Sequence, residues 1–261
     1  WPLAEPTDVL HVVPAAPGSG LQFTCSAPDL AGPENLVAKA YAAFARAAEV
    51  TLDVAVHLEK CVPVGAGLGG GSADAAAMLQ VLNAHAGPRA LSAPHLAAVA
   101  ATLGADVPFF LQHHRPCLAR GIGEVLTPVE VDLSQFILVL CCPDIAVSTA
   151  RAYAAWDEAQ CKLPDGCNPA LTSTTCARKD VIFTDAVVLF NSFEKVVLPR
   201  EPRLTRLKEL AYRAGAAGAL LSGSGSSVFA LFRESAAAAA FARQAEALAW
   251  VGPGRVFSSH M

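Results

Sequence analysis

Five glycines within seven residues, from Gly65 to Gly71, constrain the fold of this chain more than any other stretch. An apolar run that ends at Val62 and Pro63 precedes them, and an Ala-rich helical pattern that opens with Ser72 follows. Ser and Asp are favourable at a helix start, and the alanines beyond them are strong helix formers. The sequence therefore predicts a strand, a glycine loop and a helix in succession, with the helix beginning at Ser72 or Asp74.

A glycine loop that leads into a helix is suited to bind an anion, because no side chain keeps the backbone N–H groups away from an oxyanion. The unpaired N–H groups of the first helical turn and the helix dipole add partial positive charge. A nucleotide phosphate is the anion that we expect here. The alternative is a turn without a ligand, but each glycine loses much backbone entropy on folding, so five of them are costly in a plain turn.

Two common nucleotide-binding patterns do not account for this loop. Gly65, Gly67 and Gly70 satisfy G-x-G-x-x-G, but a dinucleotide fold also requires a second strand and an acidic residue about 20 residues further on. Residues 80–98 have a helix, loop and helix pattern instead, and they contain no acidic residue. A Walker A loop ends in Gly-Lys-Ser or Gly-Lys-Thr, and no Lys follows these glycines.

The residues P-V-G-A-G-L-G-G-G-S-A-D-A-A resemble the phosphate loop of the GHMP kinase superfamily. Two later segments resemble this superfamily in the same order, namely L-G-A-D-V-P-F-F-L at residues 103–111 and the Gly-Ser segment within residues 219–232. The triple glycine followed by S-A-D is most similar to the branch that acts on a cytidylyl-methylerythritol. Ala73 departs from the Ser of that pattern, and Ser192 departs from an Asp in a later N-D-L/F-E segment.

This resemblance implies an α+β chain with the two-domain GHMP kinase fold. Residues 1–130 would form an ATP-binding domain similar to domain 2 of ribosomal protein S5, and residues 131–261 a ferredoxin-like C-terminal domain. The implied reaction is the ATP-dependent phosphorylation of the 2-hydroxyl of a cytidylyl-methylerythritol in the non-mevalonate isoprenoid pathway, with Mg²⁺ as cofactor.

The resemblance also assigns roles to individual residues. Asp106 is the implied catalytic base or orienter of the attacking hydroxyl; Gly104 permits an unusual turn before it, and Pro108 fixes the chain after it. Ser72 is the implied Mg²⁺ ligand. The implied ATP-binding residues are Asn35, Lys60, Pro63, Gly65, Ala66, Gly67, Leu68, Gly69, Gly70, Gly71, Ser72 and Ala73. The implied substrate-binding residues are Asp106, Thr149, Tyr153, Gly223, Ser224 and Gly225.

Two alternative functions remain open at this point. One is another GHMP kinase, of the homoserine or mevalonate type, and the other is a nucleotide-binding homologue without catalysis. The superfamily begins with a P-A-K-x-N-L strand, whose Lys helps catalysis, and this branch continues with a G-Y-H segment. Neither motif occurs in the sequence. We expect them upstream of Trp1 in a longer gene product, or else lost in a degenerate homologue.

Composition and charge limit the partners that we expect. The chain is 53% hydrophobic and only 16% charged, which is typical of a globular protein with a sizeable core. Its net charge is −4 without basic runs, and no apolar run reaches the ~18 residues of a membrane span. We therefore expect a small-molecule substrate, neither nucleic acid nor membrane as partner, and a monomer or homodimer.

The cysteines indicate a reducing compartment. None of the eight lies in a C-x-x-C pair or at zinc-ligand spacing. Bacterial cytoplasm and plastid stroma both fit this expectation.

The remaining pattern predicts the order of secondary structure. A turn joins two strands within residues 8–26, and Asn35 is the expected N-cap of a helix over residues 36–48. Further strands are expected at 51–58, 117–126, 136–142 and 255–257, and a strand, turn and strand at 219–232. Further helices are expected at 78–86, 94–103, from about Ser148 to Tyr153, and at 181–190, 203–214 and 235–250, with a surface loop at 157–180.

Overall fold

The computed structural model describes residues 5–112, 116–121, 123, 125–161 and 189–260. It contains two compact units. The first comprises Trp1–Val64 and Gly69–Glu130, and the second comprises Gly65–Leu68 and Val131–Met261. Four residues of the glycine loop therefore group with the second unit, although the residues on either side of them belong to the first.

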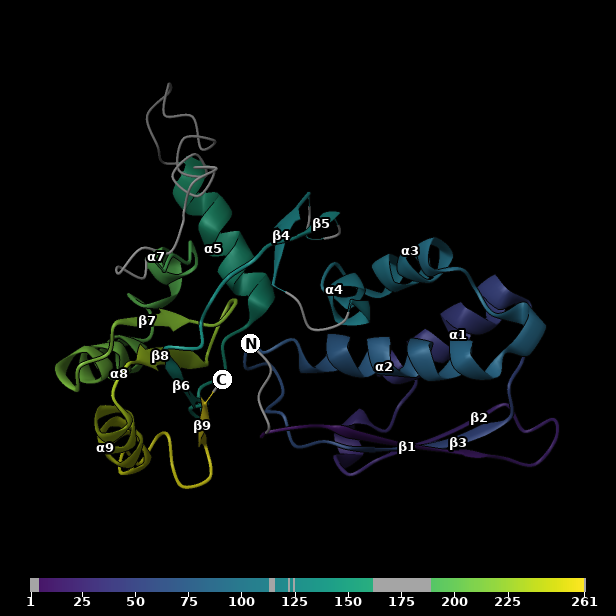
Figure 1. The fold of residues 1–261 in the computed structure, drawn as a ribbon, viewed down its shortest axis with the longest axis horizontal. Helices are drawn as coiled ribbons and strands as arrows, with labels where there is room; N and C mark the ends of the chain where they lie inside the picture. Colours follow the sequence, from purple (N-terminus) through teal and green to yellow (C-terminus); the bar gives the residue numbers. More distant parts are fainter. Residues whose placement is uncertain (1–4, 113–115, 122, 124, 162–188, 261) are drawn as a thin grey trace. The chain divides into compact units, whose positions relative to one another are not determined.

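A three-stranded sheet forms the base of the first unit (Figure 1). Its strands are β1 (Val9–Pro14), β2 (Leu21–Cys25) and β3 (Val54–Glu59). The central strand β3 runs antiparallel to β1 and parallel to β2. The alternation expected from the sequence is present, because Val56 and Leu58 are buried while His57 between them is exposed.

Two helices cover one face of this sheet, as Figure 1 shows for α1 (Leu36–Ala48) and α2 (Gly70–His85). Phe44 of α1 and Met78 and Leu79 of α2 pack with β3 in a single buried cluster. The prediction for α1 is confirmed at both ends. The prediction that α2 begins at Ser72 or Asp74 is wrong, because the helix already begins at Gly70.

The rest of the first unit consists of short elements. These are α3 (Ala93–Leu103), α4 (Val107–Leu111), β4 (Cys117–Arg120) and β5 (Val125–Pro128). The single strand predicted over residues 117–126 is wrong. The glycine pair within it divides the segment, and β4 and β5 form an antiparallel hairpin instead.

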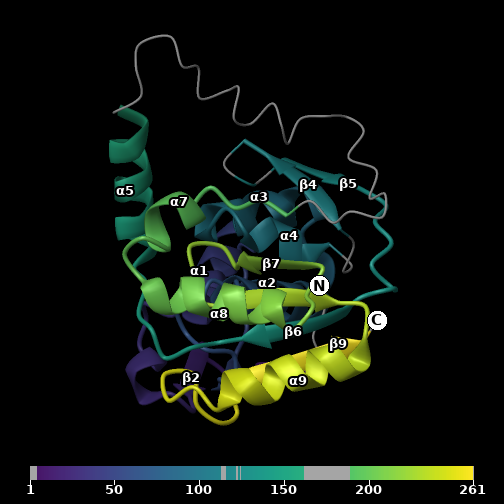
Figure 2. The same cartoon turned by 90° about the vertical axis from the view of Figure 1, so that its left-hand side faces the viewer.

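The second unit has a four-stranded antiparallel sheet in the order β7-β8-β6-β9. Its strands are β6 (Ile137–Cys141), β7 (Gly218–Leu221), β8 (Val228–Phe232) and β9 (Val256–His260), and its helices are α5 (Thr149–Cys161), α7 (Glu194–Val197), α8 (Pro202–Arg213) and α9 (Ser235–Glu246). Figure 2 shows α8 and α9 side by side on one face of the sheet. Leu204 and Leu207 of α8 and Phe241 of α9 are fully buried there. This is the ferredoxin-like arrangement that we expected.

Two sequence predictions concern a segment that lies largely outside the described residues. The expected loop at 157–180 is wrong over residues 157–161, which belong to α5, and its remainder is outside. Of the helix expected at 181–190, only residues 189 and 190 are described, and they are not helical. None of the helices that the model describes has the length and apolar content needed to cross a bilayer.

Candidate active site

The glycine loop enters α2 through a backbone conformation that only glycine adopts readily. Gly69, the N-cap of the helix, has φ 70°, in the left-handed region. A glycine N-cap carries no side chain to bond the first amides, and the first turn contains no acidic residue. Among the described residues no side chain caps this helix start, so the N–H groups of Gly70, Gly71 and Ser72 are available to a ligand, together with the positive end of the helix dipole.

The three consecutive glycines each allow a different neighbour to pack against the start of α2. A Cβ on Gly69 would lie 2.9 Å from Phe110 of α4, and one on Gly70 would lie 3.0 Å from Val62. A Cβ on Gly71 would lie 3.5 Å from Leu36, the first residue of α1. The absence of side chains thus allows α1, α4 and the segment that follows β3 to pack around one helix start.

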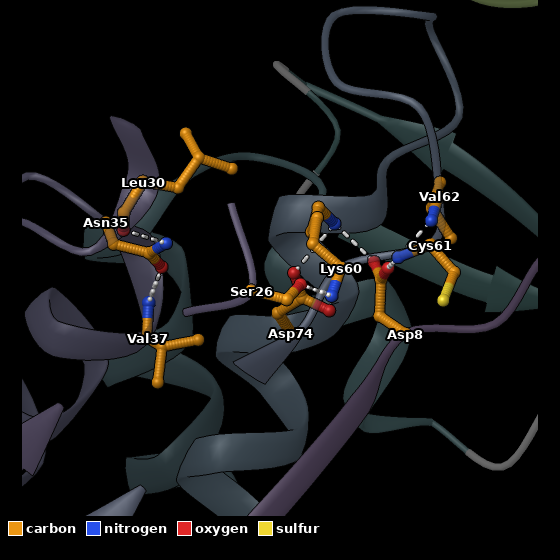
Figure 3. A network of polar contacts seen from close by, with 9 residues as sticks. All are labelled: Asp8, Ser26, Leu30, Asn35, Val37, Lys60, Cys61, Val62 and Asp74. Carbon is orange, nitrogen blue, oxygen red and sulfur yellow. Dashed lines mark hydrogen bonds and ion pairs between the residues drawn. The ribbon is translucent and has the colours of Figure 1, made fainter. Parts of the chain in front are cut away.

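Lys60 lies next to this helix start, in a buried cluster with two carboxylates (Figure 3). Its Nζ donates to Asp74 Oδ2 at 2.9 Å and to Asp8 Oδ2, and only 8% of its side chain is exposed. The two carboxylates are equally buried, at 6% exposure for Asp8 and 7% for Asp74. The sequence resemblance pointed to Lys60 as a nucleotide-binding residue, and the structure adds that two carboxylates hold its ammonium group.

Burial and the neighbouring charges shift the pKa values of Asp74 and Lys60. Burial raises the pKa of Asp74 to about 6, although the hydrogen bond and charge of Lys60 act in the opposite direction. Burial alone would lower the pKa of Lys60, but the hydrogen bonds to Asp8 and Asp74 outweigh it, so the pKa is raised. Lys60 therefore remains an ammonium ion throughout the neutral range.

Asn35 has a local structural role that the sequence predicted. Its Oδ1 accepts a hydrogen bond from the Val37 N–H at 2.9 Å, which caps α1, and its Nδ2 donates to the Leu30 carbonyl at 2.9 Å (Figure 3). Because Leu36 packs on Gly71, the start of α1 adjoins the start of α2. Whether Asn35 also contacts a nucleotide stays a prediction.

Asp106 is the N-cap residue of α4, and it is exposed while Val107 and Pro108 behind it are buried. A plain capping role would give its side chain a hydrogen bond to the first turn of the helix, and the structure shows none. Phe110 of the same short helix covers Gly69. The carboxylate of Asp106 is therefore presented by an element that packs against the start of α2.

The second unit holds the other part of the glycine loop. The Ser222 hydroxyl donates to the Gly67 carbonyl at 2.8 Å, and the Ser227 N–H donates to the Ala66 carbonyl at 3.1 Å. Gly67 has φ 74°, and a Cβ there would lie 2.1 Å from the Ser222 carbonyl oxygen. The Gly-Ser turn between β7 and β8 thus fixes the conformation of residues 66 and 67.

The same turn brings together two of the predicted substrate-binding residues. The hydroxyl groups of Thr149 and Ser224 are 2.8 Å apart. One turn further along α5, the ring of Tyr153 meets that of Phe193 edge-on, with centroids 4.9 Å apart, and Tyr153 remains 56% exposed. An exposed aromatic ring is suited to stack on a base, and hydroxyl groups are suited to bond a sugar.

Sequence analysis missed the residues that support the Gly-Ser turn. Asn191 Nδ2 donates to the carbonyls of Leu221 and Gly223, at 2.8 and 2.7 Å. Glu194 accepts from the Leu221 N–H at 2.9 Å and forms a part-buried ion pair with Lys208 at 2.6 Å. The resemblance to an N-D-L/F-E segment was the available signal, but the segment alone does not reveal what it contacts. Asp8 gave no signal at all.

Comparison with known proteins identifies the family. Residues 35–114 match the model of the GHMP kinases N terminal domain, and residues 182–249 match that of the GHMP kinases C terminal. A curated relative, 4-diphosphocytidyl-2-C-methyl-D-erythritol kinase of Solidesulfovibrio magneticus, is 46% identical over 89% of this chain and 78% of its own length.

Solved structures give the same result for the fold. A crystal structure of 4-(cytidine 5'-diphospho)-2C-methyl-D-erythritol kinase matches with a TM-score of 0.72 and 33% identity, over 96% of this chain and 84% of that one. A homoserine kinase from Cytophaga hutchinsonii matches at 18% identity and a TM-score of 0.63, over 92% and 80% of the two chains, which shows the fold alone. Since the two family models cover more than half of the sequence and the relatives cover most of it, this chain belongs to the GHMP kinase family.

Proposed function

We propose that this protein is an ATP-dependent kinase that phosphorylates the 2-hydroxyl of 4-diphosphocytidyl-2-C-methyl-D-erythritol. The observation that carries the proposal is the 46% identity to a kinase named for that substrate, over most of both chains. Membership of the GHMP kinases supports the use of ATP. In this proposal, residues 1–130 form the ATP-binding domain and residues 131–261 the C-terminal domain.

The glycine loop and the start of α2 bind the ATP phosphates in this proposal. The free N–H groups of Gly70, Gly71 and Ser72 supply donors, and the helix dipole supplies partial positive charge. Binding through fixed backbone donors needs no rearrangement during the reaction, which favours stabilisation of charge on the transferred phosphate.

Mg²⁺ fits the side chains at this position. Mg²⁺ in kinases is held by one or two protein oxygens together with substrate phosphates, so it needs no cage of protein ligands. Among the described residues no cluster of three or more His, Cys, Asp or Glu side chains could hold a metal. Ser72, half-buried in the first turn of α2, is the residue that we propose as a ligand. The ion would neutralise charge on the phosphates.

Asp106 accepts the proton of the attacking hydroxyl, or orients that hydroxyl, in this proposal. The new bond joins the acceptor oxygen to the γ-phosphorus, and the bond from that phosphorus to ADP breaks. Phosphoryl transfer depends mostly on positioning and charge stabilisation, so one well-placed carboxylate together with a metal ion is sufficient in principle. Asp106 is exposed at the start of α4, and its side chain makes no capping hydrogen bond; both observations support this role.

The second unit recognises the cytidylyl substrate in this proposal. The ring of Tyr153 stacks on the cytosine, and the hydroxyls of Thr149 and Ser224 bond polar groups of the substrate. Gly223 and Gly225 carry no side chains, so the backbone of this turn can approach the ligand at these two positions.

The test compares three acceptors at the same ATP concentration: the cytidylyl-methylerythritol, homoserine and mevalonate. We expect ADP release to depend on the first. Higher kcat/KM with homoserine or mevalonate would contradict the proposal and favour another GHMP kinase. Calorimetric binding of ATP without turnover of any acceptor would instead favour a nucleotide-binding homologue without catalysis.

A further inference from the structure

The chain between strand β3 and the glycine loop is held by side chains rather than by the sheet. After Glu59, the last residue of β3, three successive N–H groups bond to side-chain oxygens. The N–H of Lys60 donates to Ser26 Oγ at 2.8 Å, and those of Cys61 and Val62 both donate to Asp8 Oδ1 at 2.7 Å. Figure 3 shows Asp8 lying across this short stretch. Its carboxylate therefore sets where the glycine loop begins.

The far end of the loop meets the same cluster. A Cβ on Gly70, the first residue of α2, would lie 3.0 Å from Val62 Cγ1 and 3.1 Å from Lys60 Nζ. One helical turn further on, Asp74 accepts a hydrogen bond from Lys60 at 2.9 Å. The second oxygen of Asp8 accepts from that same ammonium group. Both ends of the loop thus meet at this cluster, where Asp8 bonds Lys60 and the N–H groups of Cys61 and Val62.

The net charge of the cluster would not strengthen phosphate binding. Two ionised carboxylates around one ammonium give a net charge of −1, which repels an anion. What the cluster supplies is geometry, because a buried ion pair with further hydrogen bonds holds its groups in a single arrangement.

We propose that Asp8 is a positioning residue for the phosphate loop: it holds the loop's first residues and Lys60, and thereby keeps the amides at the start of α2 aimed at the ATP phosphates. This inference rests on the proposed use of ATP. It adds a residue that supports ATP binding indirectly, through the backbone of the loop. Asp8 acts through the backbone of Cys61 and Val62.

Two substitutions of Asp8 separate positioning from charge. Asp8→Ala removes the acceptor for both amides, but Lys60 keeps Asp74 as its partner, so no buried charge is left unpaired and the fold is retained. Asp8→Asn keeps one carbonyl oxygen for the two amides, but it loses the charge and replaces the oxygen that accepts from Lys60 with an NH2 group. We expect the ATP dissociation constant to rise about 10- to 100-fold in Asp8→Ala, as for the loss of one hydrogen bond to a charged phosphate, and to recover most of that loss in Asp8→Asn.

Asp53 provides a matched control. Its two oxygens also accept from two backbone N–H groups, those of Gly18 at 2.9 Å and Gly20 at 2.7 Å, in the turn between β1 and β2. Asp53→Ala should lower the melting temperature without changing ATP affinity. Equal ATP affinity in Asp8→Ala and Asp53→Ala would overturn the inference.

A readout without ATP distinguishes this inference from the proposed function. Amide hydrogen exchange in the peptide that spans residues 61–72 should be faster in Asp8→Ala than in wild type, and unchanged in Asp53→Ala. Unchanged exchange in Asp8→Ala would overturn the positioning role. A wild-type protein that binds no ATP would overturn the proposed function, whereas the exchange result would still decide whether Asp8 holds the loop.

Discussion

The hydroxyl of Ser222 donates a 2.8 Å hydrogen bond to the carbonyl of Gly67, across 155 residues of sequence. The two backbones are so close that a Cβ on Gly67 would lie 2.1 Å from the carbonyl oxygen of Ser222. Glycine at position 67 is therefore required by contact as well as by its φ of 74°. This contact fixes the middle of the glycine loop from a turn that lies far away in the chain.

The contact predicts unequal effects of alanine at two neighbouring glycines. Gly65 has φ 68°, but a Cβ there would meet nothing within 4 Å, so Gly65→Ala costs only the left-handed conformation, about 1–2 kcal/mol. Gly67→Ala carries the same strain and must also displace Ser222. We expect ATP affinity to fall at least about tenfold further in Gly67→Ala than in Gly65→Ala, by calorimetric titration. Equal affinities in the two variants would show that the Ser222 contact does not shape the site.

Asp106→Asn should reduce turnover without reducing stability. The amide keeps the shape of the side chain and loses its charge and basicity, so we expect kcat to fall about 10²- to 10⁴-fold with little change in KM for either substrate. Because Asp106 makes no capping hydrogen bond, the melting temperature should stay within a degree or so of wild type. Near-normal turnover combined with a lower melting temperature would make Asp106 a structural residue.

Tyr153→Ala should weaken binding of the cytidylyl substrate and spare that of ATP. Loss of one base stack is worth about 1–3 kcal/mol, which corresponds to a roughly 5- to 150-fold rise in dissociation constant. Tyr153→Phe is the matched control, because it keeps the ring and its contact with Phe193. If Tyr153→Ala loses ATP affinity to the same extent, the ring has another role.

The buried cluster around Lys60 predicts how stability depends on pH. Burial raises the pKa of Asp74 to about 6, from an ordinary value of 3.8, against the opposing effect of Lys60. Folded Asp74 therefore binds a proton more tightly than unfolded Asp74. Its contribution to the free energy of unfolding is fully present below about pH 3.8 and is lost as the pH rises through about 6.

The variant Asp74→Asn isolates this effect, because the amide resembles the protonated acid and does not titrate. Groups that lie away from this cluster are common to both proteins, so the comparison reports the cluster around Asp74. We expect wild type to gain stability relative to Asp74→Asn as the pH falls from about 7 to about 5, measured by chemical denaturation. A difference that is constant over this range, or that changes in the opposite direction, would contradict the assigned charge state.

The parts of this molecule that depend on local sequence were predictable. Asn35 caps α1 as its residue type indicates, and the alternation of residues 51–58 predicts the buried and exposed faces of β3. The start of α2 was misplaced because a left-handed glycine can end a loop and cap a helix without any capping side chain. Capping preferences rank side chains, and they give no information on where a glycine-rich backbone turns.

The groups that support the candidate site could not be predicted from the sequence, for a different reason. Asp8 meets Lys60 across 52 residues, and Asn191 meets the carbonyl of Gly223 across 32. Each is a single polar residue in an ordinary context, and its partner is determined by tertiary structure. A single sequence contains no sign of such pairings. The resemblance to a family placed the glycine loop and Asp106 but did not indicate what holds them.

The assignment of residues 65–68 to the second compact unit has a consequence for any attempt to dissect this protein. A fragment that ends at Glu130 contains every glycine of the phosphate loop, but it lacks Ser222 and Ser227, whose hydrogen bonds fix Gly67 and Ala66. In that fragment the glycines of the loop regain conformational freedom. The entropy cost of ordering the loop would then reduce the affinity for a nucleotide. Residues 1–130 are therefore not an independent structural module, although their sequence resembles one.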